Sequence, residues 1–374
     1  GLSTNVQHLH SIITLDLHLN RISPPAQTIF DALSQVGPDG SATTSLRNVN
    51  LNNNRIYGEL PAFGARLAPL EKLDLGHNEL SGALPDDTVS HLTKMKEFSL
   101  SQNRDITGNV HEDFALMSNL EKLDIEDTGF TGELFEFTNF ALLQELHASG
   151  CSFTGPLPAS IGNAISLQVL DLEHSDLTGP LDPGIINCGS LRTLKLAHNA
   201  FDGPLPAQCI ETAGSVPADA ALCAAVEMGT DTSRAQCETV QRTDGGGAAC
   251  TFQSLLSNAG SMQHLDLSYN SFEGGISDLL DMLPASYPTL TQFNLEENRL
   301  DGAIPASLSK LGNVMDMRLA GNQFTSLPAS DLSLALCSHF DVHDNKIAGA
   351  LPSLSGLVRL AYLDVYDNLL TGGL

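Results

Sequence analysis

Residues 70–85 read LEKLDLGHNELSGALP, and this stretch decides the fold because the chain repeats it. On its own it resembles a reactive site, since Asp74, His77 and Glu79 are residue types found in metal centres and acid–base pairs. The same frame, L-x-x-L-x-L-x-x-N-x-L-x-G-x-L-P, returns along the chain. A periodic architecture gives such residues a scaffold role, so the repeat has to be considered before any motif.

Copies of the frame cover nearly the whole chain. Clear examples lie at 45–61, 120–135, 166–182, 190–206 and 290–305. Thirteen repeats are counted at the Asn position, with markers at 20, 54, 78, 103, 128, 151, 175, 199, 270, 298, 322, 345 and 368. Most steps between markers are 23 to 25 residues, and the longer ones are 34, 71 and 28 residues. Extra material therefore lies mainly after the first and the eighth repeat.

The repeated frame resembles the leucine-rich-repeat family, in its plant-type subclass with an L-x-G-x-L/I-P tail. That subclass occurs in receptor-kinase ectodomains, glycanase-inhibitor proteins and algal or protist surface proteins. The resemblance implies an α/β solenoid, a superhelix or horseshoe of about thirteen repeats with a parallel concave sheet. We expect repeats 1 to 8 in residues 1–206, a cysteine-containing non-repeat insert at 207–261, and repeats 9 to 13 in 262–374.

The physics of the frame accounts for most of its fixed letters. The L-x-L alternation predicts a short strand with leucines inward and the intervening residue outward. An Asn amide donates and accepts at once, so the Asn position predicts a ladder of hydrogen bonds to the backbone of adjacent turns. Ten of the thirteen markers are Asn, and the others are Thr128, Cys151 and Ser175. The recurring glycines, such as Gly82, are interpreted as tight-turn positions.

Composition restricts the possible partners. The chain has 18 Lys and Arg against 44 Asp and Glu, a net charge of −26, which disfavours nucleic acid and anionic membranes. It favours cationic ligands, divalent cations or simple solubility. There is no apolar run long enough for a transmembrane helix. No cap covers either end of the solenoid, so we expect a processed or partial piece of a longer protein, or ends that dock on neighbours.

The cysteines fall into two groups. Cys209, Cys223, Cys237 and Cys250 lie in the insert at spacings of 14, 14 and 13, without the paired C-x2-C pattern of zinc sites. We expect two disulfides there, with three pairings possible, and hence an extracellular or lumenal protein. The remaining three, Cys151, Cys188 and Cys337, fit buried thiols within the repeats. The insert itself has two possible roles, in ligand recognition or as a surface excursion for packing and assembly.

Side chains on the open sheet are the candidate ligand contacts. With the first Leu of each repeat as position 1, position 5 reads Asp124, His147, Asp171 and Lys195 in four successive repeats. This alternation predicts that opposite charges on neighbouring strands stabilise the sheet, or alternatively that they form a ligand or cation site. The full candidate set is Asp74, His77, Asp124, Glu126, Glu145, His147, Asp171, Glu173, His174, Lys195, His198, Asp341, His343, Asp344, Asp364, Tyr366 and Asp367.

Histidines are concentrated on the same face. Eight of the twelve fall on positions 3, 5, 7 or 8, whereas about two would do so by chance, which suggests a functional or pH-sensitive surface. His174 and His198 hold equivalent positions in adjacent repeats and are candidates to share a cation. Calcium or another hard divalent cation would prefer Asp341 and Asp344 stacked on Asp364 and Asp367.

No nucleophile elbow, phosphate loop, zinc-protease or dinucleotide motif occurs, and an open sheet lacks a water-excluding pocket. We therefore expect no catalysis and no obligatory cofactor. The sequence predicts an extracellular or cell-surface module that binds a protein or glycan through the concave face and the insert. Two alternatives stay open: a structural subunit of a filament, wall or surface assembly that binds copies of itself, and an inhibitor of a secreted glycanase.

Overall fold

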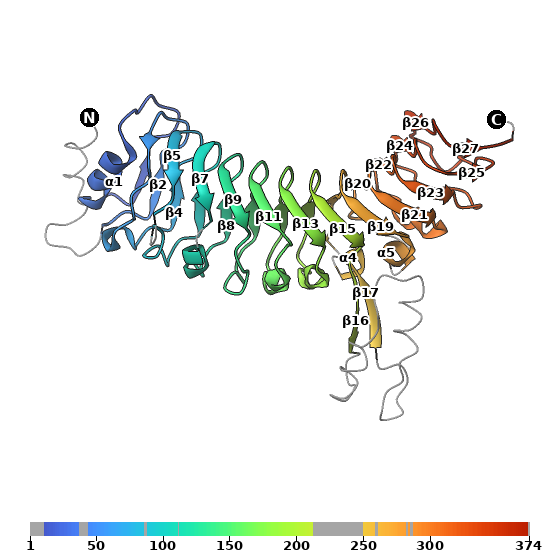
Figure 1. Ribbon diagram of the computed structural model, residues 1–374, viewed down its shortest axis with the longest axis horizontal. Coiled ribbons are helices and arrows are strands. Elements are labelled where there is room, and N and C mark those ends of the chain that lie inside the picture. Colours follow the sequence, from blue (N-terminus) through green and yellow to red (C-terminus); the bar gives the residue numbers. More distant parts are fainter. Residues whose placement is uncertain are drawn as a thin grey trace. The chain divides into compact units, whose positions relative to one another are not determined.

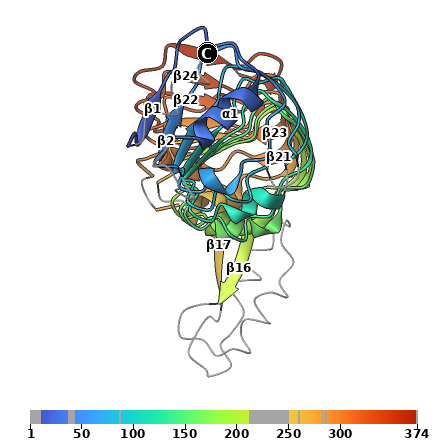
Figure 2. The same cartoon turned by 90° about the vertical axis from the view of Figure 1, so that its left-hand side faces the viewer.

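The computed structural model describes residues 11–36, 44–85, 88–110, 112–211, 250–258, 261–281, 283–284 and 287–372. The chain forms two compact halves, Gly1–Leu177 and Thr178–Leu374, each a stack of repeats (Figure 1, Figure 2). The predicted leucine-rich-repeat solenoid is confirmed in both halves. Among the described residues, no helix is both long and apolar enough to cross a membrane.

Each described repeat contributes one three-residue strand to a parallel sheet, at the predicted L-x-L position. In the N-terminal half these strands are β1 (Thr14–Asp16), β2 (Asn48–Asn50), β4 (Lys72–Asp74), β6 (Glu97–Ser99), β8 (Lys122–Asp124), β10 (Glu145–His147) and β12 (Val169–Asp171). In the C-terminal half they are β14 (Thr193–Lys195), β18 (His264–Asp266), β20 (Gln292–Asn294), β22 (Asp316–Arg318), β24 (His339–Asp341) and β26 (Tyr362–Asp364).

A second set of short parallel strands follows the Asn position. It comprises β3 (Tyr57–Gly58), β5 (Glu79–Ala83), β7 (Asp105–Asn109), β9 (Gly129–Glu133), β11 (Ser152–Gly155), β13 (Asp176–Pro180), β15 (Ala200–Pro204), β19 (Ser271–Gly274), β21 (Arg299–Ala303), β23 (Gln323–Ser326), β25 (Ala348–Gly349) and β27 (Leu369–Leu370). The expectation of tight turns at the recurring glycines was therefore wrong. Gly132, for example, lies within β9 at φ 82°, and a Cβ there would lie 2.6 Å from Asn109 Oδ1.

Helices are few in the described residues. Return segments contain short 3-10 turns at η2 (Ala65–Leu67), η3 (Glu112–Leu116), η4 (Ala159–Asn163), η5 (Pro183–Asn187) and η6 (Ala306–Lys310). Two α-helices of the described residues, α1 (Ala26–Ser34) and α5 (Ser277–Asp281), lie within the long 34- and 28-residue steps. Phe30 of α1 packs on Phe63 with ring centroids 4.5 Å apart, so the first insertion adds to the core.

The predicted Asn ladder is present. Asn103, which is 1% exposed, donates from Nδ2 to the carbonyls of Leu75, Leu100 and Ser101 at 2.8 to 3.2 Å. Its Oδ1 accepts the backbone N–H of Leu80 at 3.1 Å. Where Asn is replaced, Thr128 Oγ1 and Cys151 Sγ still donate to the Ile125 carbonyl at 2.8 and 3.2 Å, whereas the buried Ser175 hydroxyl has no hydrogen-bond partner.

The ends of the predicted insert pair with each other. Strand β16 (Ala207–Glu211) lies antiparallel to β17 (Cys250–Ser254), which leads into α4 (Leu255–Asn258), and the strand pair projects away from the repeats (Figure 1). Cys223 and Cys237 lie outside the described residues, as do the side chains of Cys209 and Cys250. The two disulfides and the insert boundaries therefore stay predictions, whereas Cys151, Cys188 and Cys337 are buried as expected.

Candidate functional site

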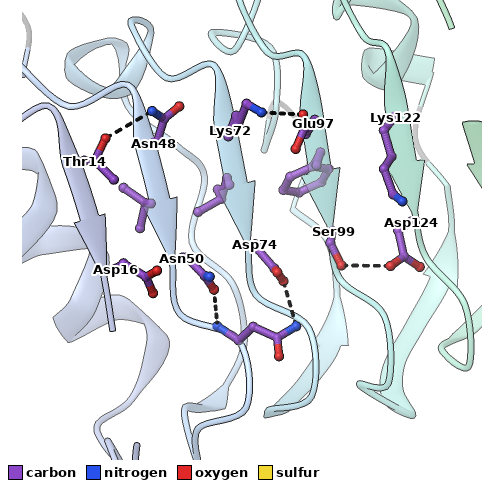
Figure 3. Close-up of a pocket in the computed structure, with 14 residues that line it drawn as sticks. Thr14, Asp16, Asn48, Asn50, Lys72, Asp74, Glu97, Ser99, Lys122 and Asp124 are labelled. Carbon is purple, nitrogen blue, oxygen red and sulfur yellow. Dashed lines mark hydrogen bonds and ion pairs between the residues drawn. The ribbon is translucent and has the colours of Figure 1, made fainter. Parts of the chain in front are cut away.

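The candidate site is the open face, defined as the sheet surface formed by positions 3 and 5 of each repeat. The strand residue between them is buried, as for Leu73 and Leu123, except in the last repeat, where Leu363 is 36% exposed. Within each half the strands pair in uniform register, so equivalent positions lie side by side. In the N-terminal half, Asp16, Asn50, Asp74, Ser99, Asp124, His147 and Asp171 form one row, of which Figure 3 shows the part from Asp16 to Asp124.

Most position-5 side chains have a structural role that the sequence did not suggest. In ten repeats the side chain accepts the backbone N–H of position 7, at 2.9 to 3.4 Å: Asp16, Asn50, Asp74, Ser99, Asp124, Asp171, Asp266, Asn294, Asp341 and Asp364. Asp, Asn and Ser are the residues that make such local turns. Part of the acidic character of the row is therefore explained by the turn that follows each strand.

The alternating charges of the N-terminal half lie on position 3, not on position 5. Lys72 contacts Glu97 on the next strand at 2.5 Å, and Lys122 contacts Glu145 at 2.6 Å. The predicted row of Asp124, His147 and Asp171 is in register, but His147 Nε2 lies 3.2 Å from Glu145 Oε2. The Lys122 ammonium, and then His147, lower the pKa of Glu145. Lys195 belongs to the other half, so its place in that row stays a prediction.

Position 8 explains several of the predicted site residues. In all thirteen repeats it has a positive φ, and Asn, Asp and His are enriched there because they tolerate this region best after Gly. His77, His174 and His198 are therefore on a backbone corner and not on the sheet surface, as are Asp344 and Asp367. The histidine excess is thus partly a property of the scaffold. His174 and His198 belong to different halves of the chain, so their shared cation stays a prediction.

Position 7 carries two carboxyls with perturbed proton affinity. Burial, followed by the nearby Asp124 and Asp171, raises the pKa of Glu126. Burial and Asp341 likewise raise the pKa of Glu296 in the C-terminal half. These carboxyls lie just beyond the strand ends, so the negatively charged surface extends beyond positions 3 and 5 of the open face.

One cluster in the C-terminal half brings predicted residues together. Ligand atoms of Asp341, His343 and Asp364 all lie within 4.8 Å of one another. The Asp341 carboxylate, 2.7 Å from His343 Nδ1, raises the pKa of that imidazole. The N–H of Tyr366 and the hydroxyl of Tyr362 lower the pKa of Asp364. Asp344 and Asp367, predicted as cation ligands with Asp341 and Asp364, are not part of this cluster.

A hollow of about 350 Å³ lies on the open face of the N-terminal half, across β1 to β8 (Figure 3). Short side chains at position 3 of the first two strands, Thr14 and Asn48, open the space beside the Lys72–Glu97 pair. Asn48 Nδ2 donates to Thr14 Oγ1 at 3.1 Å. The prediction included Asp74 and Asp124 from this hollow but missed its position-3 residues, although their alternation of Lys and Glu is visible in the sequence.

Family models described as leucine-rich repeat match residues 44–104, 142–164 and 261–283. Receptor-like protein 39 of Arabidopsis thaliana is 29% identical over 142 residues, which cover 37% of this chain and 16% of the relative. The MDIS1-interacting receptor like kinase 1 of the same plant is 36% identical over 103 residues, or 27% of this chain and 10% of the relative. The chain thus spans less than a quarter of the length of these relatives.

Solved structures share the fold over nearly the whole chain. The Arabidopsis receptor kinase HAESA, solved with the peptide hormone IDA and the co-receptor SERK1, has a TM-score of 0.72 at 21% identity. That match covers 98% of this chain and 51% of the receptor chain. A leucine-rich-repeat protein of Leptospira interrogans has a TM-score of 0.66 at 21% identity, covering 99% and 76% of the two chains. The leucine-rich-repeat fold predicted from the sequence is confirmed, and the sequence similarity is to plant receptor-like proteins.

Proposed function

We propose that this chain, a leucine-rich-repeat solenoid, is an extracellular or cell-surface recognition module that binds a peptide or protein segment on its open face. The observation that carries the proposal is the hollow of about 350 Å³ across β1 to β8. Its rim offers donors and acceptors together, and its floor includes the apolar strand residues Leu73 and Phe98. A mixed polar rim over an apolar floor is the usual composition of a recognition site.

The arrangement of the strands suits an extended ligand. Strands lie about 4.8 Å apart, so a peptide that crosses them meets a new pair of outward side chains at each step. Main-chain groups of such a peptide would meet polar partners such as the Asn48 amide and the Asn50 side chain. The titles of several structural neighbours name complexes with peptide hormones, which supports the choice of a peptide ligand.

Electrostatics favours a cationic ligand. The chain carries a net charge of −26, and the hollow is lined by Asp16, Asp74 and Asp124. Asp74 is held by two contacts to Oδ1, which accepts from the Asn52 amide and from the N–H of Gly76. Charge complementarity of this kind steers association and selects partners.

The test uses peptides selected against the full chain from a random library displayed on phage. Asn48→Trp fills the hollow without removing a buried group, because Asn48 is only half-buried. We expect this variant to weaken the selected peptides by at least about tenfold, or about 1.4 kcal/mol. Glu79→Trp, at an exposed position of β5 in the second strand set, is the matched control and should bind as the wild type does.

Three results would overturn the proposal. One is peptide affinity that is unchanged in Asn48→Trp, and another is an equal loss in Glu79→Trp. The third is a glycan-array signal abolished by Asn48→Trp when no peptide is enriched, since a glycan ligand would then replace the peptide. Sizing the chain over a wide concentration range tests the alternative of a self-assembling subunit, which predicts polymers.

A further inference from the structure

The C-terminal half contains a place where neighbouring strands carry like charges on the open face. Asp341 of β24 is paired in register with Asp364 of β26. In the N-terminal half, by contrast, each position-5 Asp has Asn50, Ser99 or His147 beside it on the next strand. Like charges directly opposite each other destabilise a sheet, so this pair needs a compensating positive charge.

Arg318, the nearest position-5 cation, is already engaged. It lies on β22 next to Asp341, but its Nε and Nη2 atoms contact Asp316 of its own strand at 3.0 to 3.2 Å. Two imidazoles approach Asp341 instead. His343 Nδ1 lies 2.7 Å from Asp341 Oδ1, and His339 Nε2 lies 3.9 Å from Asp341 Oδ2.

From this geometry we infer that Asp341, His343 and Asp364 bind a first-row transition divalent cation of the Zn²⁺ class, with His339 as a fourth ligand. The ligand atoms of the first three lie within 4.8 Å of one another. Zn²⁺ binds imidazole nitrogen and carboxylate oxygen at about 2.0 to 2.2 Å, so small side-chain rotations bring them around one ion. Imidazole selects this class of metal, whereas Ca²⁺ takes six to eight oxygens, which this set does not offer.

Surrounding contacts hold the ligands in place. The N–H of Tyr366 donates to Asp364 Oδ1 and the Tyr362 hydroxyl donates to Asp364 Oδ2, both at 2.9 Å. The Tyr362 ring stacks on the His339 ring at a centroid distance of 4.4 Å and an interplanar angle of 12°. Partners of this kind orient metal ligands and raise affinity.

The chain provides its own control. Just after β1, His18 Nδ1 lies 2.6 Å from Asp16 Oδ1, which reproduces the His343–Asp341 contact in the other half. The next strand presents Asn50 in place of Asp364, so the carboxylate from the neighbouring strand is missing. The Asp16–His18 pair should therefore not bind a metal ion.

The experiment is calorimetric titration of the tag-free full chain with ZnCl₂, together with the visible absorption spectrum of added Co²⁺. We expect one site whose affinity falls at least about tenfold in His343→Asn and in Asp364→Asn, because each removes one ligand charge or nitrogen. Both substitutions are close in size, and thermal unfolding without metal verifies that the variants fold. His18→Asn is the control and should leave zinc affinity and the Co²⁺ spectrum unchanged.

The inference is overturned if the wild-type chain takes up no Zn²⁺, or if zinc affinity is the same in His343→Asn and Asp364→Asn as in the wild type. It is also overturned if CaCl₂ binds as tightly as ZnCl₂ and His343→Asn leaves that binding unchanged, since imidazole would then play no part. Peptide binding by the N-terminal hollow is measured separately, so neither result depends on the other.

Discussion

Asn103 shows what a ladder residue does for the fold. One buried amide satisfies three carbonyls and one N–H from two adjacent repeats, none of which can reach water. A buried polar group without a partner costs about 1–3 kcal/mol. The Asn103 side chain therefore contributes strongly to the free energy of unfolding.

Asn103→Ala should therefore lower the free energy of unfolding by about 3 kcal/mol, because it removes several partners at once. Asn119→Ala is the control, since that side chain is exposed and its Nδ2 donates only to the Thr93 carbonyl at 2.8 Å. Surface changes of this kind stay within about 0.5 kcal/mol. Urea unfolding measures the free energy of unfolding of both variants. An equal loss in the two would rule out the ladder as the reason why Asn recurs at this position of the repeat.

His77 has a backbone role that the sequence did not predict, whereas the ligand contact predicted for it stays a prediction. It was predicted as a ligand contact, but it lies at φ 51° on the corner after the strand, where its N–H donates to the Ser101 carbonyl at 2.8 Å. The left-handed region costs an ordinary L-residue about 1–2 kcal/mol, and β-branched residues are the least suited to it.

We expect His77→Gly to keep or raise the thermal unfolding midpoint and to leave peptide affinity unchanged. His77→Val should lower stability by about 1–2 kcal/mol. If His77→Gly abolishes peptide binding while the fold is intact, the side chain is a ligand contact after all, and the scaffold interpretation of position 8 fails.

At the scale of elements, each strand and the turn after it form one module. Position 5 accepts the N–H of position 7, position 8 turns the backbone, and the position-9 amide donates to a carbonyl of the preceding repeat. The carboxyls of these turns lie close together across repeats, and burial makes their repulsion stronger. Glu126 is the clearest case in the N-terminal half.

Because burial and the neighbouring Asp124, Asp171 and Asp127 raise the pKa of Glu126, the folded chain holds this proton to higher pH than the unfolded chain. The stability that results is present below the ordinary value of 4.5 and is lost as pH rises through the folded pKa. Glu126→Gln should therefore become more stable relative to the wild type as pH rises from 4 to neutrality. A stability difference that is constant over this range would contradict the shift.

Much of the architecture could be predicted from the sequence. Leu73 and Asn78 recur at fixed spacing, and their buried and ladder roles follow from strand alternation and amide chemistry. The backbone corner at His77 could not be predicted so directly, because the periodicity reports burial and not φ. The second strand set was missed because Gly132 suggested a turn. The Lys72–Glu97 pair was not predicted, because its alternation of Lys and Glu lies on position 3 and not on position 5.

At the scale of the whole molecule, net charge governs how partners approach. With a charge of −26, the chain should attract cations over a range that shrinks from about 30 Å at 0.01 M salt to about 10 Å at 0.1 M. The described part of each half adds local features to this field: a hollow in the N-terminal half, and a histidine–aspartate cluster in the C-terminal half.

Peptides selected on the full chain should therefore be rich in Lys and Arg, and their association rate should fall steeply with salt while dissociation changes little. Stopped-flow binding at several salt concentrations measures both rates. Enrichment of neutral or acidic peptides, or an association rate that does not change with salt concentration, would show that the negative charge of the chain plays no part in recognition.

The central claim is that the open face of the N-terminal half binds the ligand, and carboxylate footprinting by mass spectrometry tests it most directly. The chain is labelled with carbodiimide and an amine, with and without the tightest peptide from the selected library. We predict that bound peptide protects Asp16, Asp74 and Glu97, which line the hollow, and leaves the exposed Glu79 and Glu133 of the second strand set labelled as before. Protection of Glu79 and Glu133 without protection of Asp16, Asp74 and Glu97 would contradict the claim.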